Sequence, residues 1–238
     1  MAREATVSAP AAAGRRLRFN EVATRDGFQN EARFVPTADK IALVDRLSGL
    51  GYAKIEVTSF TSPAAIPALR DAEEVMRGIR RAPGVVYTAL VPNVRGAHRA
   101  LECRTDEFNL VMSASETHNL ANLRMTREQS FAQLSQVVRI AQEAGVPVNV
   151  SLSTVFGCPM EGEIDPEGVI AWVARFAALG VAGVTLCDTT GMAHPSQAKA
   201  LCARVLEGFP ALALTAHFHD TRGMGLANGL AAAQAGVG

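Results

Sequence analysis

The sequence predicts an α/β protein of the (β/α)8 TIM-barrel type, with about seven of the eight strand–helix units present. Strand-like and helix-like segments alternate at a repeat of roughly 30 to 40 residues, which is typical of βαβ units around a parallel sheet. In addition, Asp26, His217 and His219 fall at the ends of strand-like segments. Barrels of this type collect their functional groups at those strand ends.

Seven segments combine apolar residues with flanking turn residues and are expected to be strands. They comprise residues 17–23, 54–60, 85–91, 107–113, 146–155, 183–188 and 212–219. The first strand leads into Arg25 and Asp26 before a turn at Gly27.

Helices are expected between these strands, and several carry clear start signals. Thr37 and Asp165 are good N-cap residues, and Thr126 with Gln129 forms a capping box. The expected helices lie within residues 37–50, 63–79, 96–103, 126–144, 165–179 and 225–235, and a further helix begins at residue 195. Residues 118–119 are expected in a polar loop.

The boundaries of the fold follow from the same patterns. Residues 1–16 are Ala-rich and are expected to form a disordered tail, and residues 17–238 are expected to form the catalytic barrel domain. The last residues, 236–238, resemble the start of an eighth strand. Seven strands alone leave two unpaired sheet edges, which favour association. We therefore expect a barrel truncated before strand 8, and a homo-oligomer such as a dimer.

The overall charge balance excludes two classes of partner. Basic and acidic residues number 23 each, so no net field favours nucleic acid or an anionic membrane. No apolar run approaches the ~20 residues that span a bilayer. The four cysteines are widely spaced in a chain without a secretory signal, which predicts free thiols and a cytoplasmic location.

Two histidines and an aspartate predict a metal site. His217 and His219 are two residues apart on a strand and share one face. Paired imidazoles at this spacing can hold a divalent metal, and Asp26 could add a carboxylate if the first and seventh strands lie side by side. That adjacency requires a closed or strongly curved sheet. The alternative is a pair of hydrogen-bonded histidines at a strand end.

Polar residues inside strands indicate a functional inner face. Glu56 would point into the barrel, where Arg25 is its natural partner; otherwise it lies on an exposed edge strand. Asn149, Ser151 and Ser153 share one face of their strand and are expected to line a ligand-binding surface. Asp188 lies at the end of the sixth strand. Its side chain either faces a ligand at the barrel mouth or serves as a helix-capping or turn residue.

The remaining motifs are less informative. His98, His118 and His194 have no neighbouring ligands, and Cys158 in a GCP loop is expected to be structural. The chain contains no GxxxxGK[ST], no GxGxxG after a strand and no GxSxG. These absences argue against phosphate-loop, dinucleotide and serine-hydrolase functions.

Several linked motifs resemble one family. The segments EVATRDGFQNE, KIEVTSFTSP, GCPMEG, LCDTTGM and AHFHDTRGMGLAN occur in the order found in 3-hydroxy-3-methylglutaryl-CoA (HMG-CoA) lyases of the DRE-TIM metallolyase superfamily. This resemblance implies a TIM barrel with Mg2+ or Mn2+ and an acyl-CoA substrate. It implies that Asp26, His217 and His219 bind the metal. Further residues are implied to be catalytic (Arg25, Asp26, Glu56 and His217) or near the substrate (Asp188 and Thr189). Gln29, Asn149 and Ser151 are expected to bind substrate as well.

The implied reaction is a retro-Claisen cleavage that yields acetyl-CoA and acetoacetate, with Arg25 stabilising the enolate. The family's fourth metal ligand, an Asn, and its loop Cys have no counterpart up to Gly238. The lyases carry an aromatic and a basic residue where this chain has Ser151 and Asn149, which leaves open another substrate such as a citramalyl thioester. Alternatives are an acyl-CoA/2-oxoacid condensing synthase, a non-catalytic metal-binding barrel and, more remotely, an amidohydrolase-type hydrolase.

Overall fold

The computed structural model describes residues 16–238, so residues 1–15 of the predicted tail lie outside the described part. Its centre is one sheet of seven parallel strands that pair in chain order. The strands are β1 (Asn20–Glu21), β2 (Lys54–Ser59), β3 (Val86–Leu90), β4 (Glu107–Ser113), β5 (Val148–Ser153), β6 (Gly183–Asp188) and β7 (Ala213–Phe218). The predicted TIM-barrel-type α/β fold is thereby confirmed.

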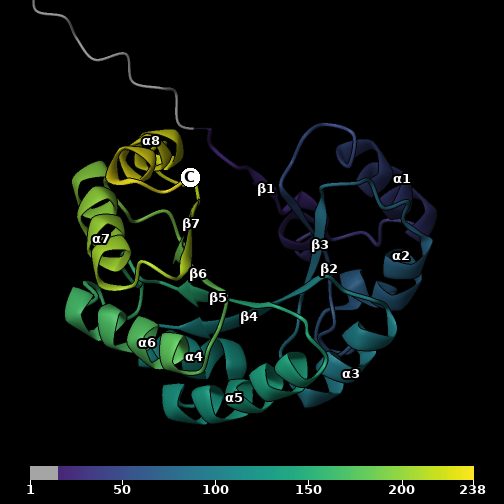
Figure 1. Cartoon of the computed structure of the whole chain (residues 1–238), viewed down its shortest axis with the longest axis horizontal. Coiled ribbons are helices and arrows are strands. Elements are labelled where there is room, and N and C mark those ends of the chain that lie inside the picture. The colour runs from purple at the N-terminus through teal and green to yellow at the C-terminus, as the bar shows by residue number, and fades with distance from the viewer. Residues whose placement is uncertain (1–15) are drawn as a thin grey trace, which may run out of the picture.

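Helices cover the outer face of this sheet (Figure 1). They are α1 (Thr37–Leu47), α2 (Ala72–Gly78), α3 (Val94–Glu102), α4 (Glu116–Leu123), α5 (Arg127–Glu143), α6 (Pro166–Ala178), α7 (Pro195–Gly208) and α8 (Gly225–Ala235), with the short 3-10 helix η2 (Pro67–Leu69) before α2. Within residues 16–238, none of these helices combines the length and apolar character needed to cross a membrane.

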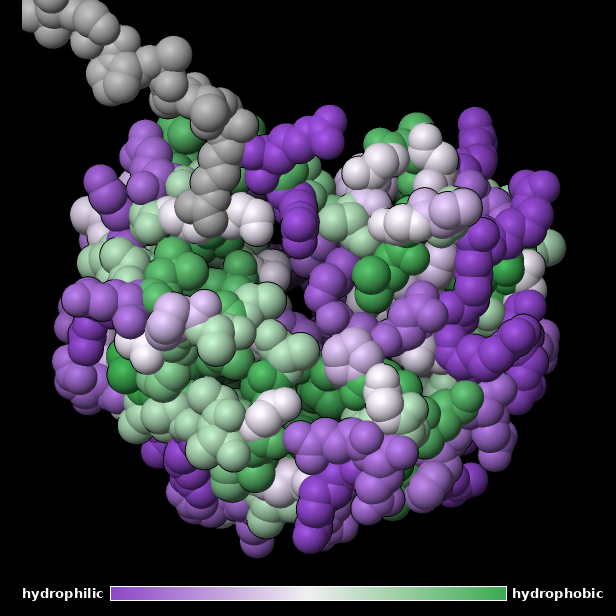
Figure 2. Space-filling view, viewed as in Figure 1, coloured by the Kyte–Doolittle hydropathy of each residue, from purple (hydrophilic) through white to green (hydrophobic). Residues whose placement is uncertain are grey.

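The sheet curves strongly without closing. In the ladder, β1 and β7 are the two ends of the strand order and do not pair with each other. Figure 1 shows them on either side of the opening in a C-shaped arrangement, and Figure 2 shows that the same face is hollowed near its centre. The described residues thus form an open barrel whose first and last strands face each other.

Apolar and polar residues alternate along the strands and separate two environments. Ile55 and Val57 of β2 are at most 2% exposed and belong to the hydrophobic core under the helices. Glu56 between them lies on the opposite, inner face. The interior of the barrel therefore carries polar side chains, as the sequence of β2 predicted.

Three local predictions were wrong. The first strand is short because Ala23–Gly27 form a π-helical turn, η1, in which the amide of Asp26 donates to the carbonyl of Val22 at 2.7 Å. Thr37 is not an N-cap but the first residue of α1, which follows Pro36, whereas the helix expected within residues 63–79 is present as α2. The expected polar loop at residues 118–119 is helix α4, whose N-cap Ser115 accepts from the amide of His118.

Candidate metal centre

Three candidate metal ligands from opposite ends of the chain meet at the C-terminal edge of the sheet. Asp26 lies in η1 directly after β1, whereas His217 and His219 lie at the end of β7. Asp26 Oδ2 is 3.9 Å from His217 Nε2 and 3.6 Å from His219 Nε2. Ligand atoms of all three residues lie within 4.8 Å of one another. The curvature of the sheet therefore produces the adjacency that the sequence required.

The donor set fits a six-coordinate divalent ion. Ligand atoms about 2.1 Å from such an ion lie about 3.0 Å apart when adjacent and about 4.2 Å apart when opposite. The separations of 3.6 and 3.9 Å lie between these values, so small side-chain shifts bring the donors onto one ion. Imidazole and carboxylate donors together suit first-row divalent ions. Burial lowers the pKa of His217 and nearby His219 lowers it further, against the opposing charge of Asp26. His217 is therefore neutral at pH 7 and has a lone pair to offer.

Arg25 fixes the orientation of Asp26 from the adjacent position in η1. Its Nη1 donates to Asp26 Oδ1 at 2.8 Å, which leaves Oδ2 directed towards the histidines. Its Nε donates to Glu56 Oε2 at 2.8 Å, and its Nη2 forms an ion pair with the same oxygen at 2.7 Å. Burial lowers the pKa of Arg25, but the charges of Glu56 and Asp26 outweigh this effect and raise the pKa above its ordinary value. Arg25 is a permanent cation at this site.

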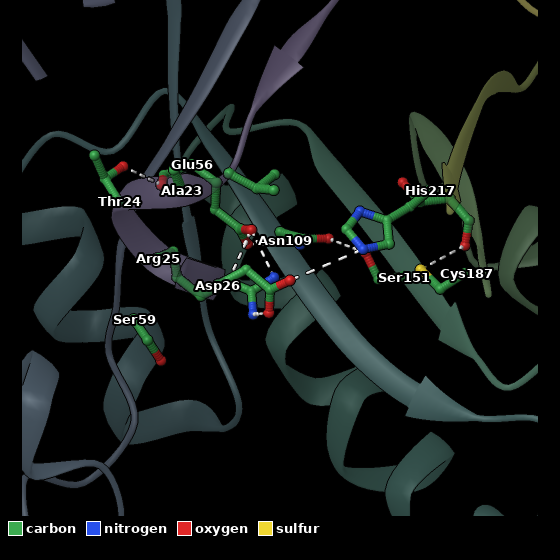
Figure 3. Close-up of polar contacts among 12 residues, drawn as sticks. Ala23, Thr24, Arg25, Asp26, Glu56, Ser59, Asn109, Ser151, Cys187 and His217 are labelled. Atoms are coloured by element: carbon green, nitrogen blue, oxygen red, sulfur yellow. Dashed lines mark hydrogen bonds and ion pairs between the residues drawn. The ribbon is translucent and has the colours of Figure 1, made fainter. Parts of the chain in front are cut away.

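Glu56 is held by donors on both sides. Arg25 donates to Oε2, and Asn109 Nδ2 of β4 donates to Oε1 at 2.7 Å. Its side chain is only 5% exposed, so these donors replace the water that a carboxylate needs. Figure 3 shows Glu56 between Arg25 and Asn109, and Asp26 directed towards His217. The predicted Arg25–Glu56 pair is present, and Glu56 does not lie on an exposed edge.

The polar face of β5 continues this arrangement deeper in the barrel. Asn149 Nδ2 donates to both Asn109 Oδ1 and Thr185 Oγ1 at 2.9 Å, and Ser151 Oγ donates to Asn109 Oδ1 at 2.9 Å. Asn149 is buried and uses both amide N–H groups, whereas Ser151 is half-buried. Of the predicted β5 contacts, Ser151 is therefore the more accessible to a ligand.

The remaining predicted substrate-binding residues surround this edge. Asp188 ends β6, and its Oδ1 accepts from the amides of Met192 and Ala193 at 2.7 and 3.1 Å, so the alternative turn role is real. Its Oδ2 is buried without a hydrogen-bond partner among the described residues.

Thr189 Oγ1 accepts from the amide of Thr154 at 2.9 Å. Gln29 lies half-buried just after η1.

Two inner residues were not predicted from the sequence. Asn109 was missed. It is a polar residue between the apolar residues of EFNLVMS (107–113), and the same alternation identified Asn149 on its own strand. Cys187 pairs in register with His217 on the neighbouring strand. Burial raises the pKa of the Cys187 thiol to about 12, so this thiol is protonated and a poor nucleophile at neutral pH. The four cysteines are free and buried, as the sequence predicted.

Comparison with known proteins places this geometry in context. A family model described as HMGL-like matches residues 16–238. Hydroxymethylglutaryl-CoA lyase YngG of Bacillus subtilis is 44% identical over 223 residues, covering 94% of this chain and 75% of that protein. The human mitochondrial hydroxymethylglutaryl-CoA lyase is 38% identical, with 94% and 69% covered.

Solved structures agree with these sequence relatives. An HMG-CoA lyase from Acinetobacter baumannii, in complex with coenzyme A and 3-methylmalate, superposes with a TM-score of 0.89 at 49% identity, covering 93% of this chain and 72% of that one. The Bacillus subtilis HMG-CoA lyase superposes with a TM-score of 0.90 at 45% identity, covering 93% and 74%. The chain thus spans about three-quarters of the length of these lyases.

Proposed function

Because the chain belongs to the HMG-CoA lyase (HMGL-like) family, we propose that it is a divalent-metal-dependent carbon–carbon lyase. Its substrate is a thioester like HMG-CoA, and its products are acetyl-CoA and acetoacetate. The observation that carries the proposal is the cluster of Asp26, His217 and His219 beside the half-buried cation Arg25.

Asp26, His217 and His219 would hold the ion, which we propose to be Mg2+ or Mn2+. When bound, such an ion supplies Lewis acidity that lowers the pKa of a substrate hydroxyl. The two imidazoles favour Mn2+, because Mg2+ prefers oxygen ligands.

Arg25 is suited to stabilise the developing enolate. Two of its five N–H groups donate to Glu56 and Asp26, and Nη2 also forms an ion pair with Glu56, so N–H groups of the guanidinium remain for a substrate oxygen. Its pairing with Glu56 and Asp26 holds the guanidinium before substrate arrives, so little reorganisation accompanies the reaction. Glu56 is therefore proposed to act by orienting Arg25.

The proposed reaction moves one proton off the substrate and one proton back. A base removes the proton of the tertiary hydroxyl, the carbon–carbon bond breaks, and its electron pair passes into the thioester as an enolate. Protonation of the enolate carbon yields acetyl-CoA. His217, at the cluster and neutral at pH 7, is the residue that we assign to proton relay.

The ligand class and setting are also proposals. The Acinetobacter relative is bound to coenzyme A, which supports an acyl-CoA ligand contacted by Gln29, Ser151, Asn149, Asp188 and Thr189. The free, buried thiols support a reducing compartment, for which we propose the cytoplasm. The unpaired edges of β1 and β7 support a homo-oligomer.

The decisive experiment measures release of acetyl-CoA from HMG-CoA, with Mn2+ and with a chelator. We expect metal-dependent release by the wild-type chain. His219→Ala should abolish Mn2+ binding and release together, because the cluster loses one of its three ligands. His98→Ala is the matched control, since His98 is an exposed histidine on α3.

Two results would contradict the assignment. Mn2+ binding without release of acetyl-CoA would contradict cleavage of HMG-CoA by this chain. Assays with a citramalyl thioester and with acetyl-CoA plus a 2-oxoacid would then distinguish another lyase, a synthase and a non-catalytic metal-binding barrel. Unchanged Mn2+ affinity in His219→Ala would remove His219 from the metal site.

A further inference from the structure

Asn109 connects the metal centre to the deep polar face of the barrel. It lies on the inner face of β4 and is 9% exposed. One amide N–H donates to Glu56 Oε1 at 2.7 Å, and Oδ1 accepts from Asn149 Nδ2 and Ser151 Oγ, each at 2.9 Å. A single side chain therefore joins β2, β4 and β5 at the level of Glu56 (Figure 3).

The direction of these hydrogen bonds allows one arrangement of the Asn109 amide. An ionised carboxylate only accepts hydrogen bonds, so the NH2 group must face Glu56 and the carbonyl must face Asn149 and Ser151. Asn149 is fixed in the same sense because it donates to Thr185 Oγ1 as well. A Cβ at Gly183 would lie 3.0 Å from Asn149 Oδ1, so the network packs tightly against β6.

The same hydrogen bonds continue to the candidate ligand Asp26. Glu56 Oε2 accepts a hydrogen bond from Nε of Arg25 and forms an ion pair with its Nη2, and Nη1 of Arg25 donates to Asp26 Oδ1. Because Asn109 satisfies Oε1, Arg25 serves only one oxygen of Glu56 and keeps Nη1 for Asp26. Without the amide, Oε1 would be a buried acceptor lacking a donor, and Arg25 is the adjacent group that can turn to it.

We propose that Asn109 is a positioning residue for the metal centre, acting through Glu56 and Arg25 on Asp26. The inference rests on the proposed metal site. None of the residues proposed to contact the metal or the substrate lies on β4, so this role is the first assigned to that strand. The neutral amide is essential to this role, since it donates to Glu56 without adding a charge that competes with Arg25.

Three variants of the full chain test this role, with Mn2+ affinity measured by electron paramagnetic resonance. Asn109→Leu removes the amide, and we expect the Mn2+ dissociation constant to rise about tenfold, the lower range for indirect partners of metal ligands. If the chain cleaves HMG-CoA, kcat/KM should fall as well, because the same substitution also frees the proposed substrate contacts Asn149 and Ser151. Thr185→Val is the control, since it alters the same network beyond Asn149, and its Mn2+ affinity should match wild type.

Asn109→Asp separates positioning from packing. It keeps the shape and the oxygen that accepts from Asn149 and Ser151, but places a second carboxyl group against Glu56. A proton on either group restores a donor, so its Mn2+ affinity should fall increasingly below wild type as pH rises from 6 to 8. If Asn109 had a purely structural role, the loss of Mn2+ affinity would be the same at every pH from 6 to 8.

Mn2+ affinity within twofold of wild type for both folded Asn109 variants would overturn the proposal. Because affinity is the readout, this result is independent of whether the wild-type chain cleaves HMG-CoA. Wild-type Mn2+ binding without cleavage would contradict the proposed function alone.

Discussion

At the scale of single residues, the site is governed by charge pairing in a partly dry environment. Arg25 is 14% exposed and forms ion pairs with Glu56, at 5% exposure, and Asp26, at 24%. Removing one partner of a buried pair leaves an uncompensated charge, which costs about 3 to 5 kcal/mol of stability. Changes at these positions therefore affect folding as well as chemistry, and the two effects must be measured separately.

Arg25→Met should weaken Mn2+ binding, because Asp26 loses the donor that orients it, and it should lose turnover even at saturating Mn2+. Loss of the enolate partner should reduce kcat by about 10²- to 10³-fold, the scale for one electrostatic donor. Arg99→Met is the control, because Arg99 forms a comparable partly buried ion pair with Glu73 away from the candidate site. It should lower the melting temperature without changing kcat. Near-normal turnover of Arg25→Met would exclude the enolate role.

At the scale of elements, local start signals position the helices that surround the barrel. Thr126 Oγ1 accepts from the amide of Gln129 at 3.1 Å, and Gln129 Oε1 accepts from the amide of Thr126 at 2.9 Å. This reciprocal pair forms the capping box of α5, the longest helix described. The capping box was predicted correctly because it depends on residues only three apart.

Thr126→Ala should destabilise the protein by about 1 kcal/mol, because the Gln129 amide loses its acceptor at the helix end. For a chain of this size, the melting temperature should fall by about 2 to 4 °C. Urea titration measures the change in the free energy of unfolding. Thr126→Ser keeps the hydroxyl, so its stability in this titration should remain close to that of the wild type. Equal stabilities of the Ala and Ser variants would show that the cap contributes nothing.

At the scale of the whole molecule, an open sheet holds a site that depends on both of its ends. The Asp26 turn follows β1 and the histidines end β7, yet these strands do not pair. The amides of Ala213 and His219 donate to β6 at 3.1 and 3.3 Å. By the alternation of a parallel ladder, the amides of Leu214, Ala216 and Phe218 face the open side.

Those three amides should therefore exchange with solvent faster than amides in the centre of the sheet. We expect a difference on the order of 100-fold relative to Val150 and Leu152 of β5, which has a strand on both sides. Hydrogen exchange resolved by residue measures it. Uniform protection across β7 would show instead that a second chain covers this edge, as expected for a homo-oligomer.

Periodicity and turn residues were sufficient to predict the parallel α/β fold, most strand positions and the grouping of Asp26, His217 and His219. These features depend on short sequence separations and on the rule that parallel strands end at one edge. The π-helical turn of η1, helix α4 and the role of Asn109 depended on the tertiary structure. Asn109 meets Glu56, 53 residues away, only because β2, β3 and β4 are neighbours in a curved sheet. Side-chain contacts across strands are set by register and curvature, which no local pattern encodes.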